Sequence, residues 1–297
     1  MRLRAHLANV ATFTKFIDSV NKLARRVVFT FGPDDILLVS TGDDEDGLRI
    51  HGTIKVPELF GSTYCVESNM NNNIHVEVST QAFASAVRQT SSSPTEIVIR
   101  LAKLGRTPYM SFVAKTVGRS GVEYQVEQQV VVKVLKPPDL KDLPELKIPT
   151  PDTIIALPKI SDLCKVAERL KSLSDLITIS ASRNGGFRLG ITTEHARVET
   201  EWRGLHSFHA PSTQVTQDGT PRPTSAFYEV TVKSRGLLRC LHANLGEVSM
   251  AYICEGSCVA LYNFVGGNAQ LSGIEDGSER TGSLATYLPA VNEDVDD

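Results

Sequence analysis

Positively charged side chains recur on one face of four segments that have helical spacing. At about 100° per residue, each basic face lies opposite an apolar stripe, such as the stripe that contains Phe13 and Val20. Basic faces without interleaved aromatic residues suit electrostatic contact with phosphates, not base stacking. We therefore predict noncovalent binding to a nucleic-acid backbone by Lys15, Lys22, Arg25, Arg26, Arg88, Lys165, Arg169, Arg235 and Arg239.

The distribution of charge along the chain strengthens this prediction. The chain has a net charge of −3, yet the four helical segments together carry a net charge of +9, which leaves −12 for the remainder; the segments are Asn9–Arg26, Ser79–Thr90, Lys159–Lys171 and Lys233–His242. A solvated surface explains one basic helix face, but the same asymmetry in four helices favours a polyanionic partner. Like charges four residues apart mildly destabilise a helix unless an anion lies nearby.

The sequence offers no arrangement of residues that predicts catalysis. It contains no phosphate-binding loop, dinucleotide-binding glycine motif, nucleophile elbow or H-E-x-x-H motif. His206 and His209 form an H-x-x-H with no carboxylate close in sequence, so chance spacing is the better interpretation. The acidic cluster Asp43–Asp46 lacks the alternating oxygen ligands of a calcium loop and reads as a solvated hairpin tip. We expect a non-enzymatic protein with no cofactor and no metal.

The five cysteines predict reduced thiols. Their number is odd and their spacing is scattered, which argues against a disulfide framework. Cys254 and Cys258 lie four residues apart, but no second pair follows to complete a zinc site. The N-terminus has no secretory signal, and no apolar run reaches the length of a membrane span, so we expect a soluble intracellular protein.

The basic residues must be positioned by helices that alternate with β-hairpins. Asn9 is a suitable N-cap, and after it Phe13, Phe16 and Val20 recur at three- and four-residue spacing. Segments rich in β-branched residues follow, with the turn G-P-D-D between two of them. This pattern predicts an α+β fold in which helices cover one face of antiparallel sheets.

The pattern occurs twice, which predicts two similar domains. A shift of 147 residues places Phe13, Phe16 and Val20 on Ile160, Leu163 and Ala167, and a shift of 152 residues places Val78 on Val230. A repeat of half the chain length indicates two domains related by pseudo-symmetry. We predict an N-terminal domain over 1–135, a linker over 136–152, a C-terminal domain over 153–291 and an acidic tail over 292–297.

The predicted linker and two further segments are polar. Lys136–Asp152 holds five prolines, so we expect it to form neither a helix nor a central strand. His206–Pro223 and Gly266–Gly282 are rich in small polar residues and are expected to be surface loops.

These features resemble the PCNA-type sliding clamps, which consist of repeated units with outer sheets and inner helices. Lys136–Asp152 takes the place of the family's interdomain connecting loop, and the C-terminal YLPA resembles its C-terminal segment. Within this family the chain most resembles the Hus subunit type of the nine-one-one checkpoint clamp. The segments that carry this resemblance are MRLRAHL, FTKFIDSVNKLARRVVFTFGPDDILLV, IALPKISDLCKVAERLKSLSDLITISAS and YLPA.

The resemblance implies a subunit of a heterotrimeric checkpoint clamp in the nucleus. Its implied partners are two other clamp subunits, a clamp loader ATPase and double-stranded DNA that is bound without sequence specificity, with no membrane partner. It also implies a partner-binding pocket formed by Leu37, Leu38, Leu135, Tyr287, Leu288 and Pro289.

The sequence also allows three other functions. A homotrimeric replicative clamp would share the fold and require self-complementary edge strands. An enzyme that holds an anionic substrate would need a pair of titratable catalytic residues. A protein-interaction module with incidental basic helices would show no salt-dependent association with DNA.

Overall fold

The structure is a computed structural model of the whole chain. The residues that it describes are 1–42, 46–90, 96–117, 121–141, 143, 149–208, 223–245, 248–265 and 282–291. The predicted loops around 209–222 and 266–281, the acidic residues 43–45, His209 and the tail 292–297 therefore lie outside the described residues.

The chain divides into two compact units. The first comprises Met1–Asp43, Ile50–Glu145 and Phe264–Leu284, and the second comprises Asp44–Arg49, Leu146–Asn263 and Ala285–Asp297. Each unit thus includes one short stretch from the other half of the sequence. The domain bounds expected from the sequence stay predictions.

The first unit contains two antiparallel sheets and two main helices. One sheet has the strand order β5-β1-β7-β8-β9, and the strands of the other follow the order β10-β6-β2-β3-β4. The strands are β1 (Arg2–Leu7), β2 (Arg26–Phe31), β3 (Asp35–Ser40), β4 (Arg49–Lys55), β5 (Phe60–Glu67), β6 (Ile74–Ser79), β7 (Glu96–Leu104), β8 (Thr107–Val117), β9 (Glu123–Val131) and β10 (Lys133–Val134). The helices are α1 (Val10–Leu23), α2 (Val56–Leu59), α3 (Thr80–Thr90) and α4 (Pro137–Leu140).

The second half of the chain repeats this architecture. Its strand orders are β15-β11-β17-β18-β19 and β14-β13-β12-β16. The strands are β11 (Thr153–Ala156), β12 (Leu176–Ser182), β13 (Phe187–Thr192), β14 (Arg197–Trp202), β15 (Ser207–Phe208), β16 (Phe227–Lys233), β17 (Ser249–Cys254), β18 (Cys258–Val265) and β19 (Gly282–Pro289). The helices are α5 (Ile160–Lys171) and α6 (Ser234–His242).

The strand orders confirm the sequence repeat. The order β6-β2-β3-β4 of the first half corresponds to β16-β12-β13-β14 of the second, and β5-β1-β7-β8-β9 corresponds to β15-β11-β17-β18-β19. Val78 and Val230, which the 152-residue shift superposes, are both buried on the strands that precede α3 and α6. The expected α+β class, with helices on antiparallel sheets, is therefore confirmed.

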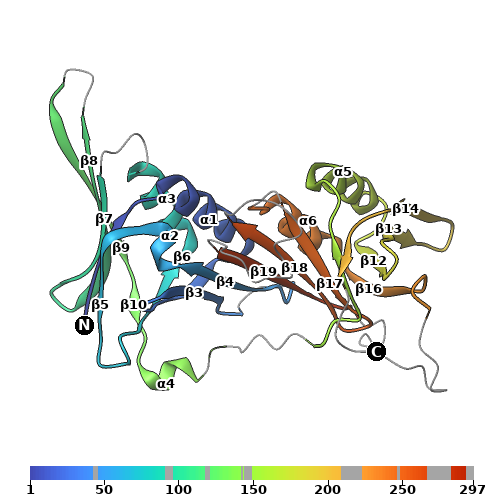
Figure 1. The fold of residues 1–297 in the computed structure, drawn as a ribbon, viewed down its shortest axis with the longest axis horizontal. Helices are drawn as coiled ribbons and strands as arrows, with labels where there is room; N and C mark the ends of the chain where they lie inside the picture. Colours follow the sequence, from blue (N-terminus) through green and yellow to red (C-terminus); the bar gives the residue numbers. More distant parts are fainter. Residues whose placement is uncertain are drawn as a thin grey trace. The chain divides into compact units, whose positions relative to one another are not determined.

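Each half pairs its two main helices. Helix α1 packs against α3, and α5 packs against α6, as Figure 1 shows. Helix α1 begins where predicted, since the Asn9 side chain accepts a hydrogen bond of 3.1 Å from the Thr12 backbone N–H. The apolar stripe of α5 buries Leu163, Ala167 and Leu170, as the 3.6-residue period requires.

Aromatic rings fill the core of the first unit. Phe83 of α3 lies 6.2 Å from Phe13 of α1, 5.1 Å from Phe29 of β2 and 5.0 Å from Phe112 of β8, measured between ring centroids. One helix side chain thus joins both sheets and the second helix. The exposed residues of α3 are mostly polar, namely Gln81, Ala82, Arg88 and Gln89.

Two features of the secondary structure differ from expectation. Helix α1 ends at Leu23, so Arg25 lies beyond its C-cap and Arg26 is the first residue of β2. The linker contains the one-turn helix α4, although its prolines predicted none. Pro137 and Pro138 occupy the first turn, where a missing backbone N–H costs no helical hydrogen bond.

Candidate nucleic-acid interface

The first helix pair carries three of the predicted basic residues. Lys15 and Lys22 are exposed on α1, and Arg88 is exposed on α3. Arg88 Nε donates a hydrogen bond of 2.7 Å to Asp18 Oδ1 and so ties α3 to α1. Part of this charge therefore stabilises the helix pair and is not available to a ligand in full.

Arg25 and Arg26 do not belong to the α1 surface. Both side chains are exposed, but the chain there has left the helix. Arg26 Nη1 lies 3.3 Å from Glu77 Oε1 on the adjacent strand β6. The helical angle that placed these two arginines opposite Phe13 does not apply to an extended segment, and this part of the prediction is corrected.

The second helix pair presents its basic residues on α5. Lys165 and Arg169 are both exposed and lie one turn apart. Lys165 Nζ reaches Asp162 Oδ1 at 3.7 Å, which is a weak exposed pair. Glu168 Oε1 lies 3.5 Å from His242 Nε2 on α6, so an acidic and a basic side chain link these helices as in the first pair.

The two arginines of α6 have different environments. Arg235 is exposed. Arg239 Nη1 lies 3.4 Å from Asp46 Oδ2, and their side chains are only 26% and 11% exposed. Arg239 therefore serves an internal ion pair, which a helical projection from the sequence does not reveal.

Four of the nine predicted cations keep an exposed charge with no ion-pair partner among the described residues. They are Lys15, Arg25, Arg169 and Arg235. The prediction did not select Lys171, although it too is exposed in the last turn of α5. Lys171 could have been predicted, because it lies two residues after Arg169 in the same predicted helix.

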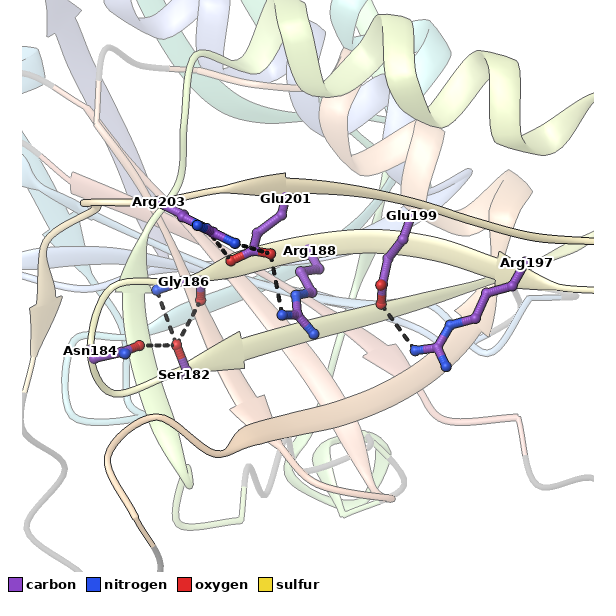
Figure 2. Close-up of polar contacts among 8 residues, drawn as sticks. All are labelled: Ser182, Asn184, Gly186, Arg188, Arg197, Glu199, Glu201 and Arg203. Carbon is purple, nitrogen blue, oxygen red and sulfur yellow. Dashed lines mark hydrogen bonds and ion pairs between the residues drawn. The ribbon is translucent and has the colours of Figure 1, made fainter.

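Basic residues on the sheet of the second unit behave differently, as Figure 2 shows. Glu201 lies 3.2 Å from Arg188 Nη2 and 2.7 Å from Arg203 Nε, and Glu199 lies 3.3 Å from Arg197 Nη2. The hydrogen bond from Arg203, with the positive charge of Arg188, lowers the pKa of Glu201. Because every arginine in this cluster faces a carboxylate, the strands offer less unbalanced positive charge than the helices.

The six residues predicted for a partner pocket fall into two groups. Leu38, Leu135 and Leu288 are core residues, since each is at most 4% exposed. Strand alternation explains the case of Leu38, because it faces the interior while its neighbour Leu37 is 38% exposed on the opposite face of β3. Of the six, Leu37, Tyr287 and Pro289 retain accessible surface, and the pocket itself stays a prediction.

Each unit also has a long strand at the edge of a sheet. Among the described residues, β9 pairs only with β8, and β14 pairs only with β13. On and beside β9, Val122, Tyr124 and Val131 are 63%, 53% and 68% exposed. Exposed edges of this length with apolar side chains invite pairing with another chain.

The described residues show neither a metal site nor a membrane span. No group of three or more His, Cys, Asp or Glu side chains in this part of the chain is placed to hold a metal ion. None of its helices is long and apolar enough to cross a bilayer.

Comparison with solved structures defines the class of fold. Proliferating Cellular Nuclear Antigen from Entamoeba histolytica superposes with a TM-score of 0.68 at 10% identity, covering 98% of this chain and 99% of that chain. PCNA from Thermococcus kodakaraensis superposes with a TM-score of 0.65 at 15% identity, covering 97% and 99% of the two chains. The fold is that of the PCNA-type sliding clamps.

Sequence comparison then gives the family. The profile of the Hus1-like protein family matches residues 1–292, and the chain belongs to that family. It is 27% identical over 271 residues to "Checkpoint protein hus1" of Schizosaccharomyces pombe, covering 89% of this chain and 93% of the relative. It is 26% identical over 250 residues to "Checkpoint protein HUS1" of Homo sapiens, covering 81% and 86%.

Proposed function

We propose that this protein is a subunit of a DNA damage checkpoint clamp, a ring that encircles duplex DNA and recruits checkpoint and repair proteins. The observation that carries the proposal is the duplicated clamp topology in a member of the Hus1-like family, with a helix pair in each half. The protein acts as a non-enzymatic scaffold in the nucleus. A clamp loader ATPase places the ring on DNA.

The proposed mechanism is topological. Ring closure keeps the DNA in place, while the exposed helix cations contact phosphates in passing. Lys15, Arg169 and Arg235 support this role because the described residues leave their charges unpaired. Contacts of this kind are weak, screened by salt and indifferent to base sequence, which allows the ring to slide.

Ring closure uses the two edge strands in this proposal. Strand β9 pairs with a strand of one neighbouring subunit, and β14 pairs with a strand of the other. Pairing satisfies the open backbone groups of both edges and covers the exposed Tyr124 and Val131.

Charges on the edge strands favour different neighbours over copies of this chain. On one face of each edge strand, β9 carries Glu123 and Glu127, and β14 carries Glu199 and Glu201 together with Arg197, which pairs with Glu199. If the middle of β9 in one copy paired with the middle of β14 in another copy, Glu127 would lie opposite Glu199 or Glu201. Like charges directly opposite destabilise a strand pair, so this observation supports a heterotrimer over a homotrimer.

The solution mass tests this proposal. We expect a monomer when the chain is alone and a 1:1:1 trimer when it is mixed with the two other checkpoint clamp subunits of the same organism. A stable homotrimer would replace the proposal with a replicative clamp. A monomer that ignores both partners would refute the ring.

A further inference from the structure

Two buried cysteines face each other at the end of a hairpin in the second unit. Cys254 is the last residue of β17 and Cys258 the first of β18, and the two are direct partners in the strand register. They are 3% and 0% exposed. The turn between them is closed by a hydrogen bond of 3.0 Å from the Ser257 N–H to the Cys254 carbonyl oxygen. Directly opposed strand residues hold their β-carbons about 4.5–5.5 Å apart, and a disulfide bond needs only about 3.5–4.5 Å, so a small shift of the strands would bring the two sulfurs into bonding range.

Polar groups around the pair give the two thiols different characters. Cys254 donates a hydrogen bond to the Cys258 sulfur, and with help from the Tyr287 and Ser257 hydroxyls this lowers the pKa of Cys258 to about 7, although burial opposes the shift. The same hydrogen bond, together with burial and the nearby Asp152 carboxylate, raises the pKa of Cys254. The lowered pKa favours the thiolate form of Cys258, and the raised pKa favours the protonated form of Cys254.

The end of the interdomain linker lies against this hairpin. The Cys254 sulfur lies 3.5 Å from the Pro149 carbonyl oxygen. The Glu255 N–H donates one of 2.7 Å to Asp152 Oδ2, and the Asp152 N–H donates one of 2.8 Å to the Ile253 carbonyl oxygen. Asp152 is only 4% exposed. The hairpin that carries both thiols thus also anchors the linker.

We propose that Cys254 and Cys258 form a peroxide-reactive dithiol whose disulfide form releases the Cys254 contact with the linker. The Cys258 thiolate attacks one oxygen of hydrogen peroxide, the O–O bond breaks, and a sulfenic acid and one water result once a proton is taken up. Cys254 sulfur then attacks the sulfenic sulfur, the S–S bond forms, and a second water leaves with the Cys254 proton. Two thiols are oxidised and one peroxide is reduced to two waters.

The other cysteines provide an internal comparison. Cys65 and Cys164 are more accessible than the pair. Burial raises the pKa of both, and for Cys65 a hydrogen bond to Glu67 adds to the effect. If accessibility alone controlled oxidation, these two would react first. The proposal predicts the opposite order.

The test is thiol mapping by mass spectrometry on the full-length wild-type chain. After limited hydrogen peroxide, remaining thiols are alkylated under denaturing conditions, and the digest is examined before and after reduction. We expect the fragment with Cys254 and Cys258 to lose the mass of two hydrogen atoms and to regain it on reduction, while Cys65 and Cys164 are alkylated. Oxidation of Cys65 or Cys164 at a dose that leaves the pair untouched would overturn the proposal.

Two variants separate the roles within the pair. Cys254→Ser should accumulate a sulfenic acid at Cys258 that dimedone traps, whereas Cys258→Ser should give no trapped product at Cys254. Equal trapping in both would refute the assigned order. Hydrogen exchange on the oxidised wild-type chain reports the linker step, with faster exchange expected at the Asp152 and Glu255 amides. Unchanged exchange in a fully disulfide-bonded sample would refute the release of the linker.

Discussion

Two histidines of the first unit are held in their neutral form by burial. His75 of β6 lies opposite Thr30 of β2, with 2.8 Å between His75 Nδ1 and Thr30 Oγ1. His51 lies on β4 opposite Val39. Burial lowers the pKa of both imidazoles from the usual 6.5, because the charged form would lose its hydration.

These histidines make stability depend on pH. Below pH 6.5 the unfolded chain binds protons at both imidazoles, whereas the folded chain does not until a lower pH is reached. The unfolded state therefore holds more protons, and we expect the free energy of unfolding to fall as the pH drops from 6.5 toward 5. Denaturant unfolding at a series of pH values measures this slope.

A matched variant assigns the effect. The double substitution His51→Gln and His75→Gln should flatten the slope between pH 6.5 and 5. Carboxylates with a lowered pKa, such as Glu96 and Glu127, lose their contribution below their usual 4.5 and leave this window clear. An unchanged slope in the double variant would show that other groups cause the acid sensitivity.

Helices were the elements that the sequence predicted best. The apolar period located α3, α5 and α6 to within one residue at each end, because a buried stripe leaves little freedom in where a helix lies. The overestimate at the end of α1 arose because Arg25 and Arg26 continue a basic pattern after the backbone has become extended. A run of basic residues is compatible with both helix and strand, so it did not show that the helix ends at Leu23.

Strand partners and buried ion pairs were beyond the sequence. Strands β9 and β10 are separated only by Val132 in a continuous β-rich sequence, yet they join different sheets. The partner of Arg239, Asp46, lies 193 positions away along the chain. Contacts between residues so far apart depend on the fold as a whole and leave no local signal. The burial of Leu38 was also beyond the sequence, because an apolar strand residue looks the same whether it faces the core or solvent.

The charges on the edge strands predict that a charge-reversed variant will self-associate. Replacing Glu123 and Glu127 of β9 with lysine would place a positive charge opposite Glu199 or Glu201 of a second copy. We expect the E123K/E127K chain to self-associate with rising concentration in sedimentation velocity, under conditions where the wild-type chain stays monomeric. Opposite charges across a strand pair contribute roughly 0.2–1 kcal/mol each and are screened by salt, so association should weaken as salt is added.

Two further variants control this experiment. E123Q/E127Q removes the repulsion without adding attraction and should associate less than the lysine variant. Adding E199K/E201K to the lysine variant restores like charges on both strands and should return the monomer. If the fourfold variant associates as strongly as E123K/E127K, strand β14 is not the partner of β9.

The distribution of exposed positive charge over the whole molecule predicts how the ring is retained on DNA. Lys15 in the first half of the chain and Arg169 in the second are exposed and have no ion-pair partner among the described residues. We therefore expect the retention of the ring on DNA to depend on several weak contacts. Reversing charge at Lys165 and Arg169 should lower retention of the assembled ring on circular DNA. The slope of log affinity against log salt should fall by about 1 for each phosphate that the ring no longer binds.

The control must change the same charge elsewhere on the same protein. Lys103 and Arg106 are exposed at the β7–β8 hairpin and belong to no helix, and K103E/R106E matches K165E/R169E in net charge. We expect both variants to assemble with the partner subunits, and only the helix variant to leave DNA faster as salt is raised. Equally fast release by both variants would mean that net charge, not the helix surface, controls retention. Failure of K165E/R169E to assemble would mean that Lys165 and Arg169 stabilise the subunit and that the DNA-facing assignment of α5 is wrong.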